Sequence, residues 1–205
     1  ERSLNVPAIN LLRMLGDNGL YRLLRKAKFS TVASEDHYGL TIALGGCEVT
    51  LLEITALYSS LANQGLYRLP KMYREQVTPE PVRLFSPGAA YLITDILTGV
   101  TRPDLPTCWE FTSLPRIAWK TGTSYGHRDA WSLGYNPRYT VGVWVGNFSG
   151  EGKPGIIGTE AAAPLLFDIF NKIGGNTRGW FKRPDSVGTR QDCAVSGQVP
   201  GRHCR

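Results

Sequence analysis

The chain has 205 residues, of which 42% are hydrophobic and 20% charged, so it can bury one sizeable core and is not disordered throughout. Its net charge of +6 favours anionic partners, but the basic cluster at 22–28 has the spacing of a solvated helix face, so we expect no nucleic-acid partner. No apolar run approaches the roughly 20 residues that span a bilayer, and no signal peptide is visible.

The first hundred residues predict mainly helices. Apolar residues recur there at helical spacing, and prolines, glycines and capping residues mark the ends. The segment 30–48 and the proline-rich connection that follows Gly65 carry no regular pattern. The expected helices cover Pro7–Leu15, residues 18–27, the segment from the capping box at Thr50 to Gly65, and the segment from Ser86 to Gly99.

The pattern changes to strands after Pro115. β-Branched and aromatic residues predict antiparallel strands over Ile117–Thr121, Ala130–Tyr135 and Tyr139–Val145, and a last helix over Ala161–Ile173. Periodicity is lost from about residue 176. The sequence therefore predicts an α+β fold over 1–175, with helices packed on an antiparallel sheet, and a linker with the start of a small module over 176–205.

Four cysteines are present, at 47, 108, 193 and 204. No pair has the C-x-x-C spacing of a zinc ribbon, and we expect neither a metal nor a cofactor. Cys193 and Cys204 are close enough in sequence for a local disulfide in an oxidising compartment. Four free thiols remain the alternative.

The segment Trp119-Lys-Thr-Gly-Thr-Ser124 is the most specific feature of the sequence. On a strand it places an ammonium group and two hydroxyls beside a backbone that Gly122 leaves unhindered. Such a strand can pair with a peptide, hold a carboxylate through Lys120 and the threonines, and direct a backbone N–H at an oxyanion. An isolated K-T-G is weak and would be a surface strand followed by a turn.

A second motif precedes this strand. Ser3-Leu4-Asn5 has the form Ser-x-Asn just ahead of a predicted helix, where it is otherwise a plain helix cap. The segments 50–65, 86–97, 129–147 and 161–164 then complete a resemblance, over about residues 2–175, to the C-terminal part of the transpeptidase domain of class A penicillin-binding proteins. The tail after Cys193 resembles the start of the extra domain of the 1C-type members.

The resemblance implies the β-lactamase/transpeptidase fold and a D,D-transpeptidase that acts on peptidoglycan stem peptides and is inhibited by β-lactam antibiotics. It implies that Ser3 relays protons, that Asn5 binds the substrate amide, and that Lys120 sets the local field and helps to hold the substrate carboxylate. Thr121, Gly122 and Thr123 would line the substrate strand, and Thr123 would give its N–H to the oxyanion hole. The periplasmic face of the bacterial inner membrane is the implied location, and cell-wall synthesis proteins are the implied partners.

The family's nucleophile belongs to a Ser-x-x-Lys motif, and no serine of this sequence has lysine three positions later. We therefore expect it on an upstream segment of the same protein, which must complete the active site. Two alternatives remain: a non-catalytic peptidoglycan-binding or scaffold module of the same fold, and a β-lactamase, although no segment resembles the loop that carries the water-activating glutamate.

Other polar and aromatic residues near the motif have simpler interpretations. Ser124, His127 and Asp129 are too close in sequence to form a triad, and we expect Asp129 to hydrogen-bond at the strand turn. Trp131, Tyr135 and Trp144 are typical of a strand core, with a sugar-binding groove as the alternative.

Overall fold

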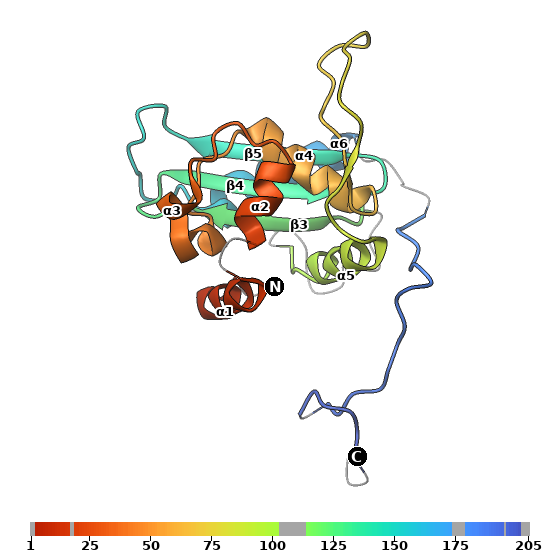
Figure 1. The fold of residues 1–205 in the computed structure, drawn as a ribbon. Coiled ribbons are helices and arrows are strands. Elements are labelled where there is room, and N and C mark those ends of the chain that lie inside the picture. The colour runs from red at the N-terminus through yellow and green to blue at the C-terminus, as the bar shows by residue number, and fades with distance from the viewer. Residues whose placement is uncertain (1–2, 17–18, 103–113, 174–178, 195, 202–205) are drawn as a thin grey trace.

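The computed structural model describes residues 3–16, 19–102, 114–173, 179–194 and 196–201. In chain order the elements are α1 (Asn5–Leu15), α2 (Gly19–Lys26), α3 (Glu35–Tyr38), the 3-10 helix η1 (Gly39–Leu44), α4 (Leu51–Ala62), β1 (Leu66–Tyr67), β2 (Val82–Arg83), α5 (Pro87–Thr98), β3 (Ala118–Thr123), β4 (Asp129–Tyr135), β5 (Thr140–Gly146), the π-helix η3 (Gly158–Ala162) and α6 (Ala163–Ile173). The predicted α+β architecture is confirmed: helices surround an antiparallel sheet of order β3-β4-β5 (Figure 1).

The two faces of this sheet are covered by different helices. Helix α6 covers one face, where Leu166, Phe167 and Phe170 are fully buried, and the Trp119 ring of β3 packs edge-on against Phe167 at 4.8 Å. Helices α4 and α5 cover the other face, where the Tyr135 hydroxyl lies 2.8 Å from Thr94 Oγ1 of α5. Because a strand alternates its side chains between the faces, β3 is held from both sides.

Helix α4 begins at the predicted capping box. The Thr50 hydroxyl accepts a hydrogen bond from the Glu53 N–H at 3.2 Å, and the Glu53 carboxylate accepts one from the Thr50 N–H at 3.3 Å. The same carboxylate also accepts the Ser30 N–H at 2.6 Å. The cap therefore joins the start of α4 to the loop that follows α2, and this contact helps to lower the Glu53 pKa.

Two regions without a sequence pattern are ordered by tertiary contacts. The segment 30–48 was expected to be irregular, but it contains α3 and η1. There the Tyr38 hydroxyl accepts the Ala33 N–H at 2.8 Å and donates to the Glu48 carboxylate at 2.9 Å. The strands β1 and β2 form the base of an arm, residues 68–81, which projects from the body in yellow (Figure 1).

The chain returns to the body after α6 before it leaves again. Arg116 lies over the Trp180 ring at 4.4 Å, and Phe181 packs against Tyr135 at 5.9 Å. Beyond these contacts the tail runs away from the sheet and makes a local turn, in which the Cys193 N–H donates to the Gln198 carbonyl at 2.8 Å.

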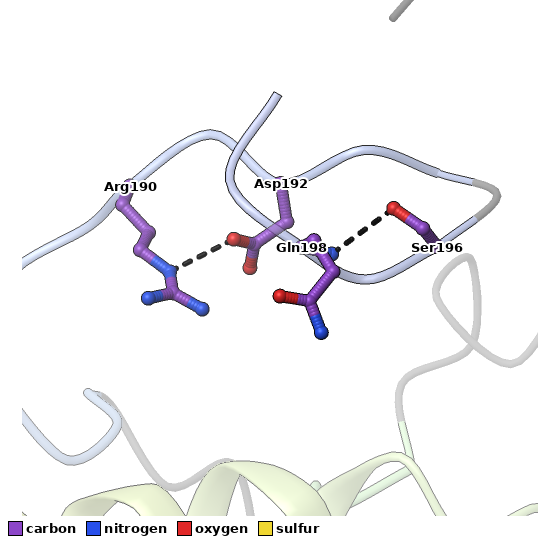
Figure 2. Close-up of polar contacts among 4 residues, drawn as sticks. All are labelled: Arg190, Asp192, Ser196 and Gln198. Atoms are coloured by element: carbon purple, nitrogen blue, oxygen red, sulfur yellow. Dashed lines mark hydrogen bonds and ion pairs between the residues drawn. The ribbon is translucent and has the colours of Figure 1, made fainter. Parts of the chain in front are cut away.

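Side-chain contacts stabilise the same turn. Figure 2 shows Arg190 paired with Asp192 and the Ser196 hydroxyl bonded to the Gln198 N–H. The predicted disulfide stays a prediction, because Cys204 lies outside the described residues, as does Cys108. Across the described parts of the chain, we find no helix with the length and apolar character needed to cross a membrane.

The cap of α4 gives a stability prediction. Thr50→Ala should lower the free energy of unfolding by about 1 kcal/mol, since it leaves an N-terminal N–H of the helix without its acceptor. Thermal melting compared with Thr189→Ala, a control in the exposed tail, measures this. Equal melting temperatures for the two variants would contradict the cap.

Buried phenols give a pH prediction. Burial raises the pKa of Tyr58 to about 12 and also raises the pKa of its ring neighbour Tyr135. An unfolded tyrosine ionises near pH 10, so the contribution of Tyr58 is present below pH 10 and is lost as the pH rises towards 12. Urea unfolding at pH 9 and 12 should show a loss on the order of 2 kcal/mol from this group, absent in Tyr58→Phe.

Candidate active site

The motif strand lies at an edge of the sheet. Among the described residues, β3 pairs only with β4, in the register Lys120↔Leu133 to Thr123↔Ala130. Lys120 and Thr121 are half-buried, whereas Gly122 and Thr123 are exposed. The residues that the sequence selected are therefore placed together along an edge that another chain can approach.

The register decides which backbone groups face outward. Just past β3, the Ser124 N–H donates to the Asp129 carbonyl at 2.9 Å, so Ser124 directs its backbone towards β4. Because the direction alternates along an antiparallel strand, the N–H and C=O groups of Thr121 and Thr123 point to the open edge. An extended peptide can pair with these groups, and the Thr123 N–H is placed to donate to an oxyanion.

The Lys120 ammonium is held against this edge. Its Nζ donates to the carbonyl oxygen of Thr121 at 2.8 Å. In the described structure no neighbouring strand pairs with this carbonyl. Partial burial removes water from the ammonium and lowers the Lys120 pKa. A nearby carboxylate would restore the lost solvation of this charge, so the site favours an anionic ligand.

Thr121 and Thr123 place their side chains on the opposite face of the strand from Lys120, where η3 begins. The N–H of Gly158, the first residue of η3, donates to Thr123 Oγ1 at 3.0 Å. Across the strand pair from Thr121 lies Ser132, whose buried hydroxyl has no hydrogen-bond partner within the described part of the chain. The threonine side chains therefore share their face of the sheet with two buried polar groups, the Gly158 N–H and the Ser132 hydroxyl, which the sequence did not reveal. We call these two groups the floor of the site.

Gly122 is not required by crowding within the chain. A Cβ atom at this position would meet only Trp131 Cβ, at an ordinary contact distance of 3.7 Å. By contrast, a Cβ at Gly134 would come within 3.1 Å of both Ile117 and Leu166. The space beside Gly122 is thus open on the face of the sheet that also carries Lys120 and Trp131, next to the free edge.

Ser3 and Asn5 lie at the start of α1. They do not cap this helix: its N-cap is Leu4, and no side chain makes a capping hydrogen bond. Ser3 has a φ of 53°, which is uncommon outside glycine and typical of strained functional positions. Both side chains are exposed, and Figure 1 shows α1 on the β3 side of the sheet, away from β5. Their convergence on Lys120 remains a prediction.

The turn after β3 has a structural role. The Ser124 hydroxyl accepts the Asp129 N–H at 2.8 Å, and the Asp129 carboxylate accepts the indole N–H of Trp144 at 2.9 Å. The expected hydrogen bonding of Asp129 at the turn is confirmed. His127 has a φ of 55° within this turn, and its N–H donates to the Ser124 carbonyl at 3.2 Å, in keeping with a loop residue.

The three aromatic residues divide between core and surface. Tyr135 is fully buried, as expected for a strand core. Trp131 and Trp144 are only partly buried and neighbour each other at 6.4 Å on the face that carries Lys120. Phe148, which packs against Trp144 at 5.9 Å, is fully exposed.

The lysine, the glycine and the two threonines at this strand edge form the K-T-G motif that occurs in the serine acyltransferases. The sequence matches the family of the penicillin binding protein transpeptidase domain over residues 1–165. The chain therefore belongs to this family.

The relatives include penicillin-binding protein 1C of Escherichia coli (strain K12), to which the chain is 34% identical over 204 residues, covering 96% of the chain and 26% of that protein. Penicillin-binding protein 1A of Neisseria lactamica is 31% identical over 205 residues, covering 90% of the chain and 25% of that protein. The chain thus spans about a quarter of the length of these curated relatives.

The fold is also similar to that of a solved penicillin-binding protein. A crystal structure of penicillin-binding protein 1A from Haemophilus influenzae matches 99% of this chain and 38% of that chain, with a TM-score of 0.78 at 18% identity. The predicted fold class and family resemblance are both confirmed.

The open space beside Gly122 gives a prediction that separates stability from ligand binding. Gly122→Ala should leave the melting temperature unchanged or slightly raised, because the new methyl group meets nothing closer than 3.7 Å. It should nevertheless weaken the binding of an extended peptide with a free terminal carboxylate, since the methyl group projects from the Lys120 face beside the edge at which the peptide would pair. Gly134→Ala, which crowds the core, should instead lower the melting temperature. Unimpaired peptide binding by Gly122→Ala would refute the assigned binding edge.

Proposed function

We propose that the protein carrying this chain is a D,D-transpeptidase that cross-links peptidoglycan by serine acyl transfer. Its donor substrate would be a stem peptide that ends in D-Ala-D-Ala, and β-lactams would inhibit it as substrate mimics. The observation that carries the proposal is the open edge of β3, where Lys120, Thr121 and Thr123 stand beside outward-facing backbone groups. Membership of the transpeptidase family supports the same reaction.

The reaction has two acyl-transfer steps. A serine hydroxyl from an upstream Ser-x-x-Lys segment attacks the carbonyl carbon of the penultimate D-Ala and loses its proton. The C–N bond to the last D-Ala breaks, and the departing amine takes up a proton. An amine of a neighbouring stem peptide then attacks the ester carbonyl and loses a proton, an amide bond forms, the C–O bond to the serine breaks, and the serine oxygen regains a proton.

The described residues would bind and polarise the substrate. The outward N–H of Thr123 would donate to the oxyanion, while the hydroxyls of Thr121 and Thr123 and the charge of Lys120 would anchor the terminal carboxylate. The substrate backbone would pair with the edge of β3 as an added strand beside Gly122.

The Ser-x-Asn residues would complete the site from the start of α1. Ser3 would relay the proton towards the leaving amine, and Asn5 would hydrogen-bond the substrate amide. The absence of any capping role for either side chain is compatible with these assignments.

The wider setting follows from the family and the substrate. We place the protein at the periplasmic face of the bacterial inner membrane, where it would work with other cell-wall synthesis proteins.

Labelling of the intact protein with a fluorescent penicillin tests this function. A stable covalent adduct is the expected result. Rapid turnover of the label would instead indicate a β-lactamase. No reaction, together with no Ser-x-x-Lys in the upstream sequence, would indicate a non-catalytic scaffold.

Lys120 provides a sharper test within the same assay. Lys120→Ala in the intact protein should reduce the acylation rate by about 10²-fold or more, because the site loses its fixed positive charge. Lys172→Ala is the matched control, since it removes an equal charge from the exposed end of α6. The role of Lys120 is refuted if the two variants acylate equally fast.

A further inference from the structure

The hydrogen bond between Gly158 and Thr123 joins two parts of the chain that are 35 residues apart in sequence. Gly158 is buried and is the first residue of η3, and η3 runs directly into α6. The N–H groups in the first turn of a helix have no acceptor within the helix itself. The Thr123 hydroxyl, at the exposed end of the motif strand, supplies the acceptor for Gly158.

This bond also limits which further hydrogen bonds the Thr123 hydroxyl can make. A threonine hydroxyl has one hydrogen to donate and two lone pairs with which to accept. The Gly158 N–H takes one lone pair, and the hydroxyl donates no hydrogen bond to any of the described residues. The hydroxyl is therefore left as a donor to a ligand, and accepting a hydrogen bond makes it a stronger donor.

Only glycine brings its N–H this close to the strand pair. A Cβ at Gly158 would lie 2.6 Å from the Gly122 carbonyl, 2.9 Å from Thr121 Cβ and 3.0 Å from the Trp131 carbonyl. Two of these neighbours are rigid backbone atoms of paired strands. A side chain at this position would have to push η3 away from β3 and β4, and the bond to Thr123 would lengthen or break.

We propose that Gly158 is a positioning residue, which holds the Thr123 hydroxyl so that its hydrogen points at the terminal carboxylate of the donor substrate. This inference rests on the proposed transpeptidase function. Gly158 itself need not touch the substrate, since it acts through Thr123. The ligand group concerned is the carboxylate, rather than the carbonyl that is attacked.

A pair of probes isolates the carboxylate. We would measure the acylation rate constant of the intact protein with penicillin V and with its methyl ester, which keeps the reactive ring but lacks the anionic carboxylate. Gly158→Ala should reduce the ratio of the two rate constants about tenfold, because a hydrogen bond to a charged group is weakened only for the acid. Gly188→Ala is the matched control, since a Cβ there meets no atom within 4 Å.

The double variant shows whether Gly158 acts through Thr123. Thr123→Val keeps the backbone N–H and the shape of the side chain but removes the hydroxyl, so it should lower the ratio as well. In the Thr123→Val background, Gly158→Ala should lower the ratio no further. An unchanged ratio in Gly158→Ala, whether or not both probes react more slowly, would make Gly158 a purely structural residue and would overturn the proposal.

Hydrogen exchange provides a test that needs no Gly158 variant, which matters if Gly158→Ala does not fold. In Thr123→Val the Gly158 amide loses its acceptor, so exchange should be faster in the peptide that contains it and unchanged in α6 beyond the first turn. Unchanged exchange at Gly158 would overturn the proposal. Failure of the unmodified protein to react with penicillin V would instead refute the transpeptidase function.

Discussion

The pairing of β3 with β4 is the constraint on which the site depends. Antiparallel strands direct the N–H and C=O groups of successive residues to opposite sides, so the register Thr123↔Ala130 fixes the outward direction of the Thr121 and Thr123 backbones. A slip by one residue would turn these groups inward and would move the lysine and threonine side chains to the wrong faces. The register of β3 against β4 thus decides which groups of the motif a ligand can reach.

The register is held from both sides of the sheet. On the α6 side, the Trp119 ring packs against Phe167, and its indole N–H donates to the Val100 carbonyl at 3.0 Å. On the α4 and α5 side, Tyr135 packs against Tyr58 and bonds to Thr94. Both anchors lie at the start of β3 or the end of β4, so the motif end of the strand can remain exposed without losing its alignment.

The site combines a floor and an edge with different properties. The edge carries the ammonium of Lys120 and free backbone groups, and it faces outward. The floor contains the Gly158 N–H and the Ser132 hydroxyl beneath the threonines, and it is buried. The Gly158 N–H orients the Thr123 hydroxyl before a ligand arrives, so less reorganisation is needed when a charged group of the ligand binds.

Much of the fold could be predicted because the deciding interactions are local. The capping box at Thr50 and Glu53, the helix start at Ser86 and Pro87, and the β-branched and aromatic residues of β4 and β5 are each signals that span only a few positions. The helices α3 and η1 were missed because they depend on tertiary contacts such as that of Tyr38 with Glu48. The short strands β1 and β2 pair across an arm of 14 residues and have no local pattern.

By itself, the sequence determined the chemical groups of the site: Lys120, Thr121, Gly122 and Thr123 are adjacent, and their order on a strand gives a charge, hydroxyls and an unhindered backbone. Only the tertiary structure decided that β3 lies at an edge, which of its backbone groups face outward, and that Gly158 supports Thr123 from below. The physical reason is that propensity and periodicity record contacts close in sequence, whereas an edge and a floor are made by segments that meet only when the chain is folded.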